Sequence, residues 1–467
     1  MIGVPADYHI PNRIADGYGL HKRAIDILKS KGTELAITVD NGINAFDEID
    51  YAKSLGIDVI ITDHHEPGKK LPKACAVLNP KRPDCRFPFK ELAGVGVVFN
   101  LIMALRQRLR DSGFFKGKEE PRLRDLLDIV AIGTVADVVP LIDENRIFVK
   151  FGLEELKKSS NRGISALKVI SGLEPHQLNA TAIAFRIAPR INAAGRIDDH
   201  NLGVRLFTTS DPEDAASIAE KLNSLNSKRQ SMEEVILKEA AKLIESDEGF
   251  KNGSTVTLAK DGWHVGVIGI VASRLADAHN RPSVVIGIAD GIGKGSLRSV
   301  GTYNIIDALA KCSDLLLNYG GHKHAAGITI ASENISLFKK KFDEIVSSTL
   351  KESDRLDAMH VDAELQSDDI TEELINELEL LEPFGEGNPE PVFCLRELKV
   401  SDARIVAEKH LKLKITDDMV VLDAIGFGMG HHAIAADDIL DVAFIPQLDT
   451  WRGRGSVQLK LKDMKRL

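Results

Sequence analysis

Residues 58–65 read Asp-Val-Ile-Ile-Thr-Asp-His-His, and this stretch decides how we interpret the rest of the chain. A β-branched run ends in a carboxylate and two imidazoles, after which Glu66-Pro67-Gly68 turns the chain. In α/β proteins, polar residues at the carboxyl ends of buried strands line the edge of the sheet where ligands bind. Carboxylate oxygen and imidazole nitrogen together suit a divalent metal such as Mn, Zn or Fe. The alternative for these residues alone is a helix-capping Asp followed by two surface histidines.

The preceding strand delivers a second ligand-type residue to the same edge. Residues 35–39 (Leu-Ala-Ile-Thr-Val) predict a short buried strand that ends in Asp40-Asn41-Gly42. Apolar residues at helical spacing over 46–55 predict a helix between the two strands. Such a β-α-β unit has parallel strands and a right-handed crossover. Asp40 and the histidine pair therefore meet at one edge, which favours a metal site over a helix cap.

A third ligand candidate, Asp137, ends an apolar run. Residues 76–78 predict another strand, and helices are predicted from Leu92 and over 126–132. The last of these helices leads into Gly-Thr-Val-Ala-Asp-Val-Val-Pro, where one acid stands among apolar residues. A buried carboxylate is unfavourable unless it is paired or bound to a metal. The alternative is an Asp that caps a neighbouring turn.

Arginines and glycine-rich segments supply anion-binding groups further along the chain. Arg190 and Arg196 flank a small-residue segment that we expect to be a loop, and guanidinium forks suit phosphate oxygens. Surface arginines on a turn are the alternative. A second α/β pattern begins at Ser254 and contains two Gly-rich segments, at 293–299 and 320–327. Their spacing does not match a Walker loop. Two segments rich in Gly, Lys, Ser, Arg and His nevertheless predict loops that bind a polyphosphate or a nucleic-acid backbone.

The last part of the chain contains an acidic stretch, a linker and a series of short strands. Residues 352–382 are strongly acidic, and Pro383–Pro391 predicts a rigid, turn-rich linker. Five short alternating strands follow and predict a β-barrel of the oligonucleotide-binding (OB) type. Trp451 and Phe427 are candidate stacking surfaces for bases, although core filling is favoured for Phe427. Basic residues on or near these strands are Arg404, Lys409, Lys412, Lys414, Arg452, Arg454, Lys460 and Lys462.

Length and composition limit the number of domains and the classes of protein to which the chain can belong. A chain of 467 residues predicts about two to four domains. No apolar run approaches the roughly 20 residues needed to span a bilayer, and no signal peptide opens the chain, so we expect no membrane association. The four cysteines are far apart, which favours reduced thiols and a cytoplasmic protein. The net charge of −9 argues against a uniformly basic surface but allows a local basic groove.

In this order, the motifs resemble the DHH phosphoesterase superfamily and, within it, the RecJ family of single-strand-specific exonucleases. The resemblance runs from about Tyr8 to the C-terminus. Its landmarks are Pro11-Asn12-Arg13, Gly17-Tyr18-Gly19, Val39–Gly42, Thr62–His65, Gly133–Asp137, Pro189–Arg196 and Gly320–Gly327. The resemblance implies an α/β chain in five parts: a DHH domain at 1–205, a connecting helix at 206–250, a DHH-associated domain at 251–350, an acidic helix and linker at 351–391, and an OB-type domain at 392–467.

The resemblance also implies roles for individual residues. Asp40, His64 and Asp137 are similar to metal ligands of a two-metal site, usually Mn²⁺ or Mg²⁺, and Asp63 and His65 to their close support. The phosphate and the strand would be held by Arg13, Tyr18, Arg190, Arg196, Ser296, Arg298 and His322. The implied reaction is 5′ to 3′ hydrolysis of single-stranded DNA in repair and recombination. Implied partners are single-stranded-DNA-binding protein and a RecQ-type helicase.

One family motif has no counterpart in this sequence. Family members carry Asp-x-Asp-Gly after an N-terminal strand, which would lie upstream of Tyr8. We therefore expect a truncated start and an incomplete metal site. Two other functions follow as alternatives: a non-catalytic scaffold that binds single-stranded DNA, and a DHH phosphodiesterase that acts on short oligonucleotides or cyclic dinucleotides.

Overall fold

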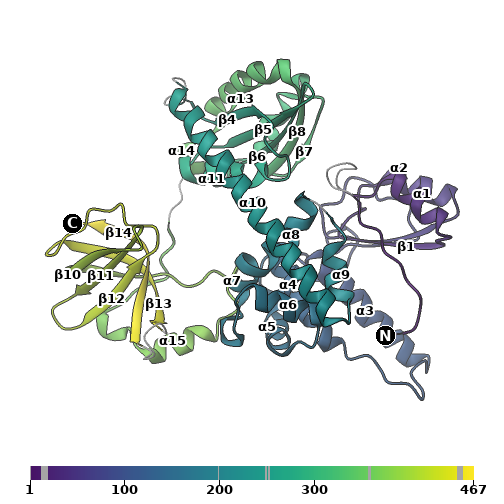
Figure 1. Ribbon diagram of the computed structural model, residues 1–467, viewed down its shortest axis with the longest axis horizontal. Coiled ribbons are helices and arrows are strands. Elements are labelled where there is room, and N and C mark those ends of the chain that lie inside the picture. Colours follow the sequence, from purple (N-terminus) through teal and green to yellow (C-terminus); the bar gives the residue numbers. More distant parts are fainter. Residues whose placement is uncertain are drawn as a thin grey trace.

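The computed structural model describes residues 2–11, 19–197, 199–247, 250, 253–355, 359–449 and 456–467. The described chain is an α/β protein with three separate sheets, as the sequence predicts. Figure 1 shows a small parallel sheet on the right, a helical bundle in the centre, a second α/β unit at the top and a barrel on the left. No described helix is long and apolar enough to cross a membrane.

The first sheet has three parallel strands and positions the histidine pair. Its order is β1 (Leu35–Val39), β2 (Asp58–Thr62) and β3 (Ala76–Leu78), which confirms the predicted strands and their direction. The helices α1 (Lys22–Ser30) and α2 (Phe46–Ser54) pack on it, and Ile25 and Ile49 of these helices join Ile61 of β2 in one buried cluster. The side chains of Leu35, Ile37 and Val39 on β1 remain about half exposed.

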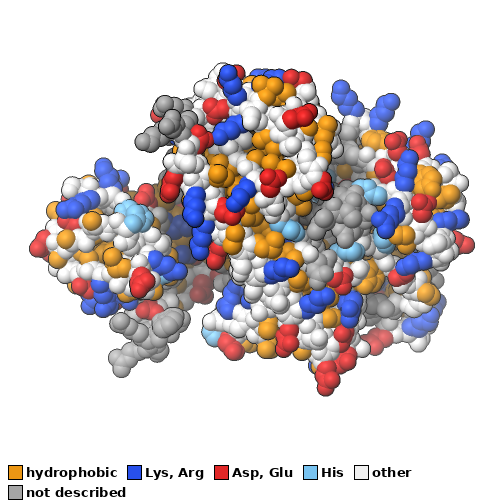
Figure 2. Space-filling model, turned by 45° about the horizontal axis from the view of Figure 1, so that its top comes forward, with side chains coloured by type: hydrophobic (Ala, Val, Ile, Leu, Met, Phe, Trp, Pro, Cys, Tyr) orange, Lys and Arg blue, Asp and Glu red, His pale blue; other side chains and the backbone are white. Residues whose placement is uncertain are grey.

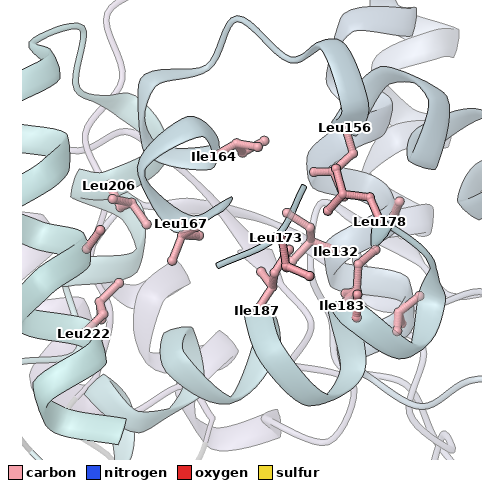
Figure 3. Close-up of a cluster of buried hydrophobic side chains, with 14 of the residues drawn as sticks. Ile132, Leu156, Ile164, Leu167, Leu173, Leu178, Ile183, Ile187, Leu206 and Leu222 are labelled. Carbon is pink, nitrogen blue, oxygen red and sulfur yellow. The ribbon is translucent and has the colours of Figure 1, made fainter. Parts of the chain in front are cut away.

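A bundle of helices forms the largest apolar core in the described chain. It contains α3 (Gly94–Asp111), α4 (Leu127–Ala136), α5 (Asp143–Lys158), α6 (Arg162–Ile170), α7 (Ala180–Ala182), α8 (Ala188–Ile197) and α9 (Leu202–Thr208). Figure 3 shows Leu156, Leu167, Ile183 and their neighbours meeting in this core. Each fully buried leucine or isoleucine contributes roughly 1.5–3 kcal/mol. The segment that contains Arg190 and Arg196 is helix α8, so the predicted loop is wrong: Ala193 and Ala194 pack into the core.

A 35-residue helix, α10 (Pro212–Ser246), joins the bundle to the second α/β unit, as the family resemblance implies. Asp211 begins the helix because its side chain accepts a hydrogen bond from the Glu213 amide. The second sheet has the order β4 (Val256–Asp261), β5 (Ser283–Ala289), β6 (Ile292–Arg298), β8 (Ala325–Ala331) and β7 (Asn318–Gly321). The helices of this unit are α11 (Ile268–His279), α12 (Ile305–Ala310) and α13 (Ile335–Thr349).

The loop predicted at residues 293–299 is wrong, because most of these residues form strand β6. Residues 293–299, which we expected to form a loop, lie almost entirely in this strand, and residues 320–327 belong largely to β7 and β8. Glycine is needed on the inner face of β6 for packing. A Cβ at Gly295 would stand 2.7 Å from Ile328, and one at Gly293 would stand 2.8 Å from Ile286.

The C-terminal strands close into a barrel, as predicted. These strands are β10 (Phe393–Val406), β11 (His410–Thr416), β12 (Val421–Gly426), β13 (Ile439–Asp449) and β14 (Ser456–Arg466). Pairing of β10 with both β11 and β13 completes the ring. The short strand β9 (Ala363–Glu364) pairs with β10, α14 (Glu352–Arg355) lies earlier in the acidic stretch, and α15 (Glu372–Glu379) packs on the barrel through Leu378.

Candidate metal centre and phosphate-binding cavity

Three ligand-type side chains from three different elements meet at one point. Asp40 follows β1, His64 follows β2 and Asp137 follows α4. His64 Nε2 lies 3.1 Å from Asp40 Oδ1 and 3.3 Å from Asp137 Oδ2. Atoms of Asp40, His64 and His65 that could hold a metal lie within 4.8 Å of one another. The convergence expected from the parallel strands is therefore present in the described chain.

The backbone around Asp40 directs its carboxylate toward His64. Asp40 has a left-handed φ of 63°, and its amide donates a hydrogen bond of 2.9 Å to the Thr62 carbonyl on the neighbouring strand. Gly94 at the start of α3 faces the carboxylate closely enough that a Cβ there would stand 2.5 Å from Asp40 Oδ1. Only glycine at position 94 leaves room for this arrangement.

Asp63 organises the histidine pair without facing the cluster itself. Its side chain is 1% exposed, and one oxygen accepts the Ile43 amide at 2.9 Å. The other oxygen accepts the His64 amide at 2.8 Å and lies 2.7 Å from His65 Nδ1. Asn79 Nδ2 donates to the His65 carbonyl at 2.8 Å. These contacts fix the directions of both imidazoles, as outer partners of metal ligands do.

The protonation states reflect these contacts. Burial raises the pKa of Asp137, and repulsion from Asp40 adds to the rise, whereas His64 opposes it. Burial alone would lower the pKa of His64, but contact with Asp40 and attraction by Asp137 outweigh it and raise the pKa above its usual value. Burial would raise the pKa of Asp63, yet its bonds with His65 and the Ile43 amide lower it. Asp63 therefore stays ionised and orients His65.

The cluster fits a divalent cation. His64 Nε2 is buried, and neither of its contacts with the carboxylates has the geometry of a hydrogen bond. Two carboxylates and an imidazole that face one another in this way offer the nitrogen and oxygen ligands that Mn²⁺ accepts. The two carboxylates repel each other, and a positive ion between them would neutralise that repulsion.

A cavity of about 730 Å³ lies between α8 and the second sheet. Arg196 enters it from α8 and donates a hydrogen bond to the Gly266 carbonyl at 3.2 Å. The predicted residues Ser296 and Arg298 line the cavity from β6. The other lining residues are Gly195, Val265, Gly266, Ile268, Gly269, Lys294, Gly295, Asn318, Tyr319, Gly320, Gly327, Ile328 and Thr329.

Alternation along β6 explains why its polar residues enter the cavity. Lys294, Ser296 and Arg298 occupy every second position, so they share one face of the sheet. Arg298 Nη1 donates to Ser296 Oγ at 3.0 Å, and burial lowers the pKa of Arg298. Within the described ranges, neither Lys294 nor Arg298 forms an ion pair with a carboxylate. Two cations without acidic partners favour an anionic ligand here.

The remaining predicted residues divide into two groups. Arg190 and His322 are described but do not line the cavity. Arg190 donates from Nε to Asn223 Oδ1 of α10 at 2.9 Å, a packing role, and His322 lies in the turn between β7 and β8. Arg13 and Tyr18 lie outside the described residues, as does Trp451.

Sequence reasoning missed Asn318 and Tyr319 as cavity residues, whereas it included Lys294 in the anion-binding segment at 293–299. Reading 292–298 as a strand would have placed Lys294 on the same face as Ser296. The expectation for Phe427 is also wrong: its ring is 55% exposed and lies 5.2 Å from the His410 ring, edge to face. Phe427 is therefore a surface aromatic on the barrel rather than part of its core.

The face shown in Figure 2 carries both signs of charge, interspersed. Several histidine side chains, in pale blue, lie between the upper part and the right-hand part of the molecule in this view. This pattern agrees with the modest net charge of −9. Any attraction for a polyanion must therefore come from local sites such as the cavity rather than from the whole surface.

Three family models match the chain in succession. The DHH family, N-terminal domain, matches residues 2–134, the DHHA1 domain matches residues 252–348, and the RecJ OB domain matches residues 361–463. The matched ranges contain the first sheet, the second sheet and the barrel.

Curated relatives and a solved structure match nearly the whole chain. The chain is 39% identical, over 99% of its length, to the single-stranded-DNA-specific exonuclease RecJ of Bacillus subtilis, and it spans 58% of that protein. It is equally identical to RecJ of Dickeya dadantii, with 99% of the chain and 83% of the relative covered. The crystal structure of Thermus thermophilus RecJ with Mn²⁺ superposes with a TM-score of 0.83 at 32% identity, covering 96% of this chain and 64% of that one.

Proposed function

The chain belongs to the RecJ family, and on that premise we propose that it is a metal-dependent exonuclease that hydrolyses single-stranded DNA from the 5′ end. The single observation that carries the proposal is the meeting of Asp40, His64 and Asp137 at one edge of the parallel sheet. Phosphodiester hydrolysis needs a positive centre where the phosphate charge develops, and the ligand types in this cluster support the proposal that it holds one.

We propose that Asp40, His64 and Asp137 hold the metal and that Asp63 and His65 support them. Mn²⁺ or Mg²⁺ bound there would polarise the phosphate and lower the pKa of an attacking water. Asp63 keeps His65 oriented through its 2.7 Å contact and holds the His64 backbone, so that both rings are placed before substrate arrives. Gly94 leaves the Asp40 carboxylate free to face His64.

The cavity supports the choice of a nucleic-acid substrate. Its volume of about 730 Å³ falls in the range of nucleotide-sized pockets. Arg298, Ser296 and Lys294 offer donors on one face of β6, where a 5′ phosphate would find charge and hydrogen bonds together. Contacts of this kind follow the backbone rather than the bases, so cleavage should depend weakly on sequence and strongly on salt.

The barrel favours a long strand over a short substrate. An OB-type barrel is a module for single strands, and the exposed Phe427 ring offers a base a stacking surface. A phosphodiesterase for dinucleotides has no need of this module. A non-catalytic scaffold is disfavoured because strand binding alone gives no reason to gather two carboxylates and an imidazole.

We propose the division of the chain at 205, 250, 350 and 391 as the boundaries of these modules. Single-stranded-DNA-binding protein and a RecQ-type helicase are proposed as partners on the family resemblance.

The proposal is tested by nucleotide release from a single strand in Mn²⁺. We expect cleavage of a 5′-phosphorylated single strand, with release of the 5′ label first and no attack on a blunt duplex. Asp137→Asn should abolish cleavage, whereas Asp125→Asn, which removes an exposed acid 55% open to solvent near the start of α4, should not. Retained cleavage in Asp137→Asn would refute the site. Strand binding by the wild-type protein without cleavage would favour the scaffold.

A further inference from the structure

A loop that belongs to the barrel unit reaches across to the catalytic half of the chain. Helix α15 packs on the barrel, residues 380–388 then leave it, and the chain returns to the barrel at β10. Between these points the loop contacts the α4–α5 junction, which follows Asp137 directly. We call residues 380–388 the barrel loop. The sequence marks it with glycines and prolines, and the proposed reaction gives it no role.

Polar contacts anchor the barrel loop at the junction. The Leu141 amide donates a hydrogen bond to the Glu386 carbonyl at 2.6 Å. Arg146 Nη2 lies within hydrogen-bond distance of three successive carbonyls, those of Leu380, Leu381 and Glu382, at 3.4, 2.9 and 3.2 Å. A guanidinium that gathers three carbonyls holds the start of the loop in one conformation.

Glycines bring the loop into direct contact with the junction. A Cβ at Gly385 would stand 2.7 Å from Leu141 Cδ1, and one at Gly387 would stand 2.8 Å from Pro140 Cβ. Gly387 also has a left-handed φ of 69°. Leu141 itself is 3% exposed and belongs to the core of the bundle. The loop therefore closes over Pro140 and Leu141 at van der Waals distance.

The anchored residues lie next to a strained turn that carries a metal ligand. Only Val138 and Val139 separate Asp137 from Pro140. Val138 has a φ of 59°, a conformation that β-branched residues rarely adopt, and its side chain is 68% exposed. Such a conformation persists only where the structure on both sides imposes it. Helix α4 holds one side, and the junction under the barrel loop holds the other.

We propose that the barrel loop is a positioning element for the metal centre: by holding Pro140 and Leu141 it keeps the Val138 turn strained and the Asp137 carboxylate directed at His64. The inference rests on the proposed metal centre but does not depend on the substrate. It also makes the barrel more than a strand-binding module, because its own loop completes the site at which the strand is cut.

Gly387→Ala tests the inference, with Gly291→Ala as the matched control. Both glycines have a left-handed φ, 69° and 76°, but a Cβ at Gly291 meets nothing within 4 Å. Both variants therefore bear the same backbone strain, and only Gly387→Ala pushes on Pro140. We expect Mn²⁺ affinity, measured by calorimetry on the full chain, to fall about tenfold in Gly387→Ala and to stay unchanged in Gly291→Ala. Amide exchange should rise over residues 137–141 in Gly387→Ala alone.

A second variant and a double-mutant cycle keep the test decisive. Arg146→Ala loosens the loop without a clash and should weaken Mn²⁺ binding in the same direction, with Arg146→Lys intermediate. In a Val138→Gly background the turn is no longer strained, so Gly387→Ala should have little further effect on Mn²⁺ affinity. Unchanged affinity and exchange in both loop variants would overturn the inference. A wild-type chain without measurable Mn²⁺ affinity would refute the metal centre and this inference together, whereas Mn²⁺ binding without DNA cleavage would refute only the proposed reaction.

Discussion

Gly94→Ala should separate catalysis from stability. Gly94 begins α3 with an ordinary helical φ, so alanine fits the backbone there. Its Cβ would nevertheless stand 2.5 Å from Asp40 Oδ1 and 2.8 Å from Asp40 Cγ. Ordinary contact begins at 3.4 Å, so the carboxylate must withdraw by about 0.9 Å, and because Asp40 Cβ would also stand at 2.8 Å the Asp40 backbone must shift with it. The Asp40 side chain is 46% exposed and can move, whereas α3 is held in its core.

The size of the effect follows from that displacement. A misplacement of about 1 Å at a catalytic group lowers the rate by about 100-fold. A disturbed metal ligand should also lower Mn²⁺ affinity, by roughly 10- to 100-fold. Gly94 is the first residue of α3, where alanine gains less helix propensity than the roughly 1 kcal/mol of a helix interior, so we expect the melting temperature to change little. Activity should therefore fall much further than stability.

The assay compares Gly94→Ala with Gly96→Ala in the same helix. A Cβ at Gly96 would meet Leu92 Cδ2 at 3.2 Å and Phe148 at 3.7 Å, and none of the three atoms nearest to it belongs to the metal cluster. We would measure single-turnover cleavage of a single strand, Mn²⁺ affinity and the melting temperature of each variant. Wild-type cleavage and affinity in Gly94→Ala would refute the role of Asp40. Equal losses in both variants would show that helix packing, and not the carboxylate, is responsible.

Three further outcomes test other parts of the structure. Arg298→Ala should remove the preference for a 5′ phosphate over a 5′ hydroxyl, measured by competition, while single-turnover cleavage of the hydroxyl strand stays close to wild type. Phe427→Ala should weaken binding of long strands by roughly 1–3 kcal/mol in a fluorescence titration and leave cleavage of the shortest oligonucleotides unchanged. Burial raises the pKa of Asp128, so its ionisation opposes folding above the usual carboxyl pKa. Asp128→Asn should therefore raise the melting temperature at pH 7 relative to wild type, with the gain shrinking toward pH 4; a gain that grows on acidification contradicts this sign.

The local sequence pattern was sufficient to predict the structure where a strand ends in candidate ligands. The runs before Asp40 and Asp63 are short, β-branched and followed at once by a turn, so strand limits, direction and the shared edge all follow from nearby residues. The third proposed ligand, Asp137, could also be predicted, because a lone acid in an apolar run needs a partner. Its partner, His64, is 73 residues away in sequence, and the contact depends on helix packing that no local pattern specifies.

Glycine misled the interpretation of the second α/β unit. Gly293 and Gly295 suggest a loop when read alone, but they lie on the buried face of a strand where isoleucine side chains leave no room for a Cβ. The sequence does not show which residue a glycine faces. A glycine needed for backbone freedom in a loop and a glycine needed for close packing in a strand therefore look the same. Arg190 shows the same limit, because its partner, Asn223, comes from the connecting helix.

The connecting helix also decides where the two halves of the site stand relative to each other. Glu233 on α10 is 2% exposed and forms ion pairs with Arg229 at 3.0 Å and with Arg274 of α11 at 2.6 Å. Breaking the ion pairs of a buried carboxylate with two guanidinium groups is strongly unfavourable, because a buried charge would be left unpaired. The bundle also touches the second unit directly. A Cβ at Gly266, just before α11, would stand 2.4 Å from the Arg196 carbonyl of α8, so these two backbone segments are in contact. These contacts hold the connector against both units, so the fold sets the separation between the proposed metal centre and the proposed phosphate cavity. A strand held by its end in the cavity would then present one defined phosphate to the metal, which is what an enzyme that cuts stepwise from an end requires.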